Sequence, residues 1–122
     1  MQIAYKNNWS VGRFGEQLVA KDCWRRGWRI IDKNWYYGKI GELDLVASDG
    51  KLIIFIEVKT RRGINCGYPL EAINARKRQK LRILAKAWLK QNAKQTMPYR
   101  IDSFAVLLDG QRSKISHLKA VA

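Results

Sequence analysis

The chain has 122 residues, of which 24 are Lys or Arg and 10 are Asp or Glu, so its formal net charge is +14. This length accommodates one domain with a substantial core, and a hydrophobic content of 47% with five Trp excludes a disordered basic tail. A charge of this size favours a polyanionic partner, with nucleic acid first and an anionic membrane surface second.

A membrane partner and a metal site built on sulfur or imidazole are both disfavoured. No apolar stretch approaches the roughly 20 residues of a spanning helix, and the first residues lack a signal-peptide core, so we expect a cytoplasmic protein. Cys23 and Cys66 lack CxxC spacing and are predicted to be free thiols. His117, the one histidine, is predicted to have a surface or packing role.

A helix is predicted over residues 10–26, with Ser10 as its N-cap. Gly12 and Gly15 each lower its helix propensity by about 1 kcal/mol relative to Ala, which indicates close approach to a strand or to a phosphate backbone. Glu16 follows one turn into the helix. Taken alone, it is an acidic residue placed favourably near a helix N-terminus.

Strands are predicted next at residues 28–35, 42–47 and 51–59. Asp49-Gly50 stands between the second and third strands, and Asp-Gly between apolar runs is a strong signal for a hairpin with a two-residue turn. Such a turn would pair Ser48 with Lys51 and thereby set the register of both strands.

In that register Asp44 faces Phe55 and Glu57 faces Glu42. Asp44 and Glu57 are then diagonal neighbours, with Cβ atoms roughly 7 Å apart. Because side chains alternate along a strand, Lys59 lies on the same face as Glu57. A slip of one residue would move Asp44 to the opposite face, so this geometry depends on the turn.

These residues predict metal-assisted phosphodiester hydrolysis. Two close carboxylates repel each other unless a cation lies between them, and carboxylate oxygens suit Mg²⁺. Lys59 is suited to orient the attacking water or to stabilise charge on the phosphate. The alternative is that Glu57 and Lys59 are ordinary exposed residues at a strand end. The apolar run 52–56, the shared face and the net charge favour the site.

A basic helix is predicted from Leu70 or Asn74 to Ala93, after a loop that begins with Thr60 and contains two arginines. One face carries a core stripe with i, i+3, i+4, i+7, i+8 spacing, formed by Leu81, Leu84, Ala85, Trp88 and Leu89. Another face stacks like charges without interleaved Glu, which indicates an anionic partner. The residues predicted to bind nucleic acid in this region are Arg61, Arg62, Lys77, Arg78, Arg82 and Lys86.

Two further strands are predicted at residues 99–108 and 113–121, joined by an Asp109-Gly110 turn. The element order is therefore α-β-β-β-α-β-β, a mixed sheet flanked by helices in one α/β domain over residues 1–122. Two alternatives are open for Arg100 and Asp102: they belong to the active site, or they form a structural ion pair.

Asp44 with Glu57-Val58-Lys59 resembles the active-site pattern of the PD-(D/E)XK nuclease superfamily. The element order resembles its archaeal Holliday-junction resolvase branch, and the whole chain is most similar to the YraN-type family of small endonuclease-like proteins. The matching segments are Gly-Arg-Phe-Gly-Glu at 12–16, Gly-Glu-Leu-Asp-Leu-Val-Ala at 41–47, Phe-Ile-Glu-Val-Lys-Thr-Arg at 55–61, Gly-Tyr-Pro at 67–69, Glu-Ala at 71–72 and Arg-Ile-Asp at 100–102.

The resemblance implies a restriction-endonuclease-like fold and a Mg²⁺-dependent endodeoxyribonuclease, with Mn²⁺ as a substitute metal. It implies that Glu16 joins Asp44, Glu57 and Lys59 at the site, with Asp44 and Glu57 binding the metal and Arg13 holding phosphate. Structured or branched DNA is the expected substrate, and resolvases usually act as homodimers. The alternatives are a non-catalytic nucleic-acid-binding module on the same fold and an RNA-associated basic protein.

Overall fold

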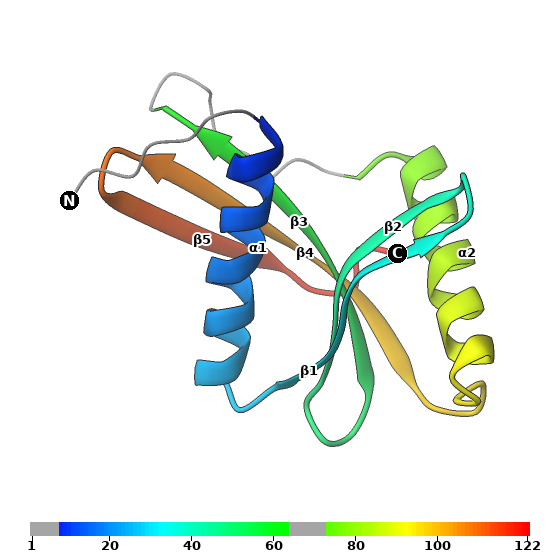
Figure 1. Cartoon of the computed structure of the whole chain (residues 1–122). Coiled ribbons are helices and arrows are strands. Elements are labelled where there is room, and N and C mark those ends of the chain that lie inside the picture. Colours follow the sequence, from blue (N-terminus) through cyan, green and yellow to red (C-terminus); the bar gives the residue numbers. More distant parts are fainter. Residues whose placement is uncertain (1–7, 64–72) are drawn as a thin grey trace.

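A computed structural model describes residues 8–63 and 73–122, and its elements follow the predicted order α-β-β-β-α-β-β (Figure 1). They are α1 (Asn8–Arg25), β1 (Arg29–Tyr37), β2 (Gly41–Ser48), β3 (Ile53–Arg62), α2 (Ala75–Gln91), β4 (Tyr99–Asp109) and β5 (Arg112–Leu118).

The strands form one mixed sheet in the order β1-β2-β3-β4-β5. Only β3 and β4 are parallel, and α2 lies in the connection between them, as a parallel crossover requires. The other neighbouring pairs are antiparallel. The last strand, β5, lies at one edge of the sheet.

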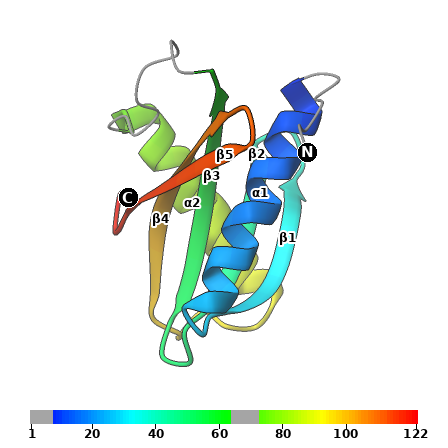
Figure 2. The same ribbon diagram turned by 90° about the vertical axis from the view of Figure 1, so that its left-hand side faces the viewer.

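The two helices cover opposite faces of the sheet (Figures 1 and 2). On the α1 side, Val19 packs with Ile54 and Ile56 of β3. On the α2 side, Trp88 packs with Phe55, and their ring centroids are 5.6 Å apart. Because β3 is buried on both faces, it needs an unbroken apolar run instead of alternation. The five residues of the predicted core stripe in α2 are all buried.

The predicted two-residue turn between β2 and β3 is wrong. Ser48 pairs with Ile53 instead of Lys51, so residues 49–52 form the loop. The Asp49 side chain accounts for this, because its Oδ1 accepts hydrogen bonds from the backbone N–H groups of Lys51 and Leu52, at 2.8 and 2.9 Å. A shift of two residues leaves every side chain on its predicted face.

The new register changes which residues oppose each other. Continued by one pair, it sets Asp44 directly opposite Glu57, where we predicted Phe55 opposite Asp44. Glu42 therefore does not face Glu57. The ladder itself ends at Leu45 and Ile56, and beyond it Asp44 and Glu57 stay on the same face of the sheet.

Boundaries differ from the prediction at the start of α1 and at the end of β3, and of the two predicted starts of α2 the one at Asn74 is confirmed. The first helix begins at Asn8, so Ser10 lies inside it and is not its N-cap. For α2, Asn74 is the N-cap and accepts a hydrogen bond from the Lys77 N–H at 2.9 Å. The third strand continues to Arg62. The rest of the predicted loop, with Cys66, lies outside the described residues. No helix in the described ranges is long and apolar enough to cross a membrane.

Candidate metal and active site

The site lies where β2 and β3 separate. The ladder between them joins residues 45–48 to residues 53–56, after which the two strands diverge (Figure 1). At the point of divergence, Oδ2 of Asp44 accepts a hydrogen bond from the backbone N–H of Val58 at 2.8 Å. This bond satisfies a strand N–H and fixes the Asp44 carboxylate in the fork.

Three carboxylates converge there from two elements. Glu16 comes from α1 and Glu42 and Asp44 from β2, and one oxygen of each lies within 4.8 Å of the others. Asn34 of β1 donates from Nδ2 to Glu16, at 2.8 Å, and to Glu42, at 3.1 Å. The φ angle of Asn34 is 51°, a left-handed conformation that Asn tolerates better than most residues.

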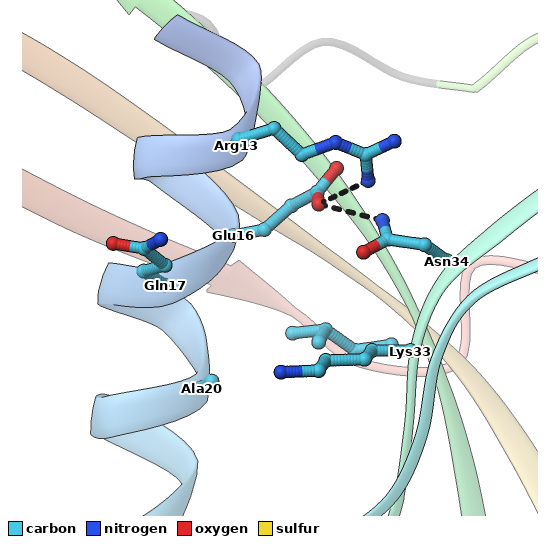
Figure 3. A pocket seen from close by; sticks show the side chains of 7 residues that line it. Arg13, Glu16, Gln17, Ala20, Lys33 and Asn34 are labelled. Atoms are coloured by element: carbon cyan, nitrogen blue, oxygen red, sulfur yellow. Dashed lines mark hydrogen bonds and ion pairs between the residues drawn. The ribbon is translucent and has the colours of Figure 1, made fainter. Parts of the chain in front are cut away.

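Arg13 holds the same carboxylates from the helix side. Its Nη1 lies 3.0 Å from Glu16 Oε1 and 3.6 Å from Glu42 Oε1. Figure 3 shows Arg13 and Glu16 reaching from the helix towards Asn34, with Lys33 beside them. These residues border a cavity of about 120 Å³ on the α1 side of the cluster.

A second cavity, of about 300 Å³, opens on the α2 side and brings in Glu57. Glu42, Asp44 and Glu57 line it from the strands, and Lys77 and Lys80 line it from α2. Glu57 forms an ion pair with Lys77 through Oε1. Its other oxygen, Oε2, is buried and has no hydrogen-bond partner among the described residues. An unsatisfied buried carboxylate oxygen is costly and indicates a missing cation or donor.

The cluster strongly perturbs its own acid–base equilibria. Burial raises the pKa of Asp44 to about 8, and the neighbouring Glu16 and Glu42 add to this, while the Val58 N–H opposes it. Burial also raises the pKa of Glu16, with Arg13 opposing and Glu42 adding to the effect. Both shifts have the sign expected when carboxylates are buried beside other carboxylates.

The remaining predicted residues fall into two groups. Lys59 is half-buried on β3, two residues beyond Glu57 and therefore on the same face of the strand. Arg61 and Arg62 are exposed where β3 ends, and Arg82 and Lys86 are exposed on α2. Arg78 differs, because it is half-buried and donates to the Ile73 carbonyl at 2.6 Å. Its guanidinium is therefore partly engaged within the chain.

Sequence reasoning missed the contributions of three residues. Glu42 lies two residues before Asp44 and therefore on the same face, but the sequence predicts no role for it. Lys77, which is predicted to bind nucleic acid, lines the cavity and pairs with Glu57. Asn34 gave no recognisable signal, because its role depends on a local backbone conformation in β1.

Asp102 belongs to a separate buried network. It is fully buried and accepts hydrogen bonds from Arg100 at 2.8 and 3.0 Å, so the predicted structural ion pair is present. His117 Nε2 lies 2.7 Å from Asp102, and its ring stacks on Phe104 with centroids 4.1 Å apart. The predicted packing role of His117 fits this arrangement. Cys23 is a buried free thiol.

Comparison with known proteins assigns most of the chain to one protein family. The model of the uncharacterised protein family UPF0102 matches residues 15–106. A UPF0102 protein of Renibacterium salmoninarum is 42% identical over 91% of this chain and 94% of its own length. One from Nocardia farcinica is 42% identical over 92% of this chain and 88% of its own length.

A solved structure has the same architecture. It is Archaeoglobus fulgidus Hjc, a Holliday junction resolvase from an archaeal hyperthermophile, with a TM-score of 0.53 and 18% sequence identity. The match covers 89% of this chain and 77% of that protein. At this identity the likeness concerns the fold. The predicted restriction-endonuclease-like α/β class, a mixed sheet with a helix on each face, is confirmed.

Proposed function

This chain belongs to the UPF0102 family, and we propose that it is a divalent-metal-dependent nuclease that hydrolyses DNA phosphodiester bonds. One observation carries the proposal. In a chain of net charge +14, four of its ten acidic residues meet at the fork between β2 and β3. Acids concentrated in this way on a basic protein suit a metal that in turn binds phosphate.

The donor set fits a hard divalent cation. Carboxylate oxygens are the ligands that Mg²⁺ and Mn²⁺ prefer. The buried Oε2 of Glu57 has no partner in the described chain, and the pKa of Asp44 is raised, so both groups would gain from a cation. We assign Asp44 and Glu57 as ligands of Mg²⁺, replaceable by Mn²⁺, with Glu42 and Glu16 beside them.

The metal, when bound, would supply Lewis-acid activation of the phosphate and a more acidic water. The chain supplies orientation. The Val58 N–H fixes Asp44, while Arg13 and Asn34 fix Glu16. Lys59, on the face of Glu57, is assigned to stabilise charge on the phosphate or to position the attacking water. Arg61, Arg62, Arg82 and Lys86 are assigned to hold flanking phosphates.

A second candidate is a non-catalytic nucleic-acid-binding module on the same fold. The ion pair between Lys77 and Glu57 favours it, because an ammonium group there neutralises a ligand without any metal. The two candidates make opposite predictions for cleavage. A site that has lost catalysis would bind nucleic acid equally well with and without a divalent cation.

Cleavage assays separate the two candidates. End-labelled single-stranded, duplex, flap and four-way-junction DNA would be incubated with Mg²⁺, Mn²⁺ or chelator, using wild type and Asp44→Asn. We expect metal-dependent products from wild type on at least one substrate and none from the variant. Binding to all substrates without cleavage under either metal would establish the binding module instead.

A further inference from the structure

Two exposed aromatic rings flank Arg13 beside the candidate site. Trp9 is 67% exposed in the first turns of α1, and Tyr36 is 60% exposed near the end of β1. Arg13 lies between them. Its Cζ is 5.0 Å from the centroid of the Trp9 ring, and its Nη2 donates to the Tyr36 hydroxyl at 3.1 Å. We name these three residues the Trp9–Arg13–Tyr36 surface.

This surface is joined to the carboxylate cluster by Arg13. The same guanidinium pairs through Nη1 with Glu16 at 3.0 Å and approaches Glu42 to 3.6 Å. Tyr36 also pairs with Glu42 across the β1–β2 ladder. The rings are therefore within one arginine side chain of Glu16 and Glu42, the two carboxylates that lie beside the proposed metal ligands.

The chemistry of this surface suits a nucleobase. Flat aromatic faces and an arginine plane stack on bases of any sequence, and a basic protein supplies the phosphate contacts that accompany stacking. A second copy of this chain is the other occupant that could cover two exposed rings. It would bring two net charges of +14 together, whereas a polynucleotide would neutralise one.

We propose that the Trp9–Arg13–Tyr36 surface stacks on an unpaired base next to the phosphate that is cut. The substrate class would then be DNA with a single-stranded segment, such as a flap, a fork or a single strand. Duplex DNA and a junction with fully paired arms present no free base face to these rings. The inference rests on the proposed function for the position of the cut, but base stacking itself is measurable without cleavage.

The test measures binding in chelator, where a metal-dependent nuclease does not cut. Fluorescence anisotropy would compare a labelled single strand, an abasic strand of the same length and a duplex. We expect the Kd for the single strand to be at least about tenfold lower than for the abasic strand, the scale of one base–aromatic stack. In Trp9→Ala/Tyr36→Ala this difference should disappear while duplex affinity changes less than twofold.

Two control variants make the result specific. Tyr36→Phe keeps the ring and loses the hydroxyl, so the preference for bases should survive. Trp24→Ala removes a 76% exposed Trp from the same helix, away from the carboxylates, and should change nothing. Equal affinity of wild type for the single strand and the abasic strand would overturn the proposal. So would a wild-type dimer that sedimentation shows to be a monomer in the double variant.

The binding result is independent of the nuclease proposal. If wild type prefers bases but never cuts, stacking stands and catalysis fails. If wild type cuts duplex and flap DNA equally and does not distinguish the abasic strand, catalysis stands and stacking fails.

Discussion

Glu57 is the residue whose surroundings most clearly call for a cation. Lys77 satisfies one oxygen, and the other is buried with no partner among the described residues. A single lysine therefore neutralises the charge but leaves half of the hydrogen-bonding capacity unused. Glu57 and Asp44 would hold a divalent ion, which would also satisfy the buried oxygen of Glu57.

Glu57→Gln should weaken metal binding because it removes a ligand charge while keeping the size of the side chain. We expect Mn²⁺ affinity, measured by isothermal titration calorimetry, to fall at least about tenfold, the lower end of the effect seen even for residues behind the ligands. Asp22→Asn is a matched control, since Asp22 pairs with Arg26 away from the site. An equal loss in both variants would show a general charge effect instead of ligation.

Asp44 should make stability depend on pH when no metal is present. Its folded-state pKa is raised to about 8 from an ordinary value near 3.8, chiefly by burial. The folded protein therefore binds this proton more tightly than the unfolded chain. The contribution is complete below about pH 4 and is lost as pH rises towards 8, by at most about 1.4 kcal/mol per pH unit.

Thermal unfolding in chelator between pH 5 and pH 8 tests this dependence. The Tm of wild type should fall relative to that of Asp44→Asn as pH rises, and Mg²⁺ or Mn²⁺ should restore it. The difference between the two proteins is the readout, because burial lowers the pKa of His117 and this contributes with the opposite sign. Parallel Tm curves for the two proteins would contradict the assigned shift.

At the scale of elements, α1 brings Glu16 to the site by packing closely on β3. Gly15 permits this approach. A Cβ atom there would lie 1.9 Å from Thr60 Oγ1 and 2.9 Å from Thr60 Cβ. The glycines predicted to mark close approach thus have different roles, because a Cβ at Gly12 would meet nothing within 4 Å.

Gly15→Ala should therefore destabilise the protein, by about 1–3 kcal/mol as for other overpacked sites. It should also displace Glu16. The matched variant Gly12→Ala should be neutral or stabilising by up to about 1 kcal/mol, because Ala favours the helix. Urea unfolding of both variants gives the comparison. Equal stability of the two would show that α1 can move away from β3 without cost.

The exposed basic residues of α2 are the ones that we propose to contact phosphate. Arg82, Lys86 and Lys90 are exposed, whereas Arg78 is partly engaged with a backbone carbonyl. Changing the three exposed residues together to Ala should reduce the slope of log K against log salt by up to about 3 for DNA binding.

Salt titrations of binding provide the measurement. Three exposed residues at the other end of the chain, Arg112, Lys114 and Lys119, form a matched control when changed to Ala. An unchanged slope in the α2 variant together with a reduced slope in the control would place the binding surface at β5 instead of α2.

At the scale of the whole molecule, the periodicity of apolar residues predicts the architecture, whereas the register of β2 and β3 depends on hydrogen bonds in the loop between them. The apolar stripe of α2 can be buried only against the sheet, and the unbroken apolar run of β3 only between two helices. These two patterns therefore predict which elements pack together and through which faces. The register does not follow from them, because the Asp49 side chain caps a longer loop than the Asp-Gly signal predicts. A shift of one residue would have moved Asp44 to the opposite face from Glu57, whereas a shift of two keeps both on one face.

The composition of the site is less predictable than its location. Asp44 and Glu57 share a face in either register, so their proximity follows from alternation alone. Lys77 reaches the site through tertiary packing, and Asn34 through a left-handed backbone conformation within β1; neither gives a periodic pattern in the sequence. The homodimer and the cytoplasmic location stay predictions.

We propose that this carboxylate site cuts DNA with the help of a divalent metal. The most direct test of this proposal is a time course of cleavage by wild type, Glu57→Gln and Lys59→Ala on a flap substrate, with Mn²⁺, Mg²⁺ or chelator. We predict cleavage by wild type with metal, none in chelator, none by Glu57→Gln despite retained DNA binding, and slower cleavage by Lys59→Ala. Cleavage that persists unchanged in Glu57→Gln would contradict the account.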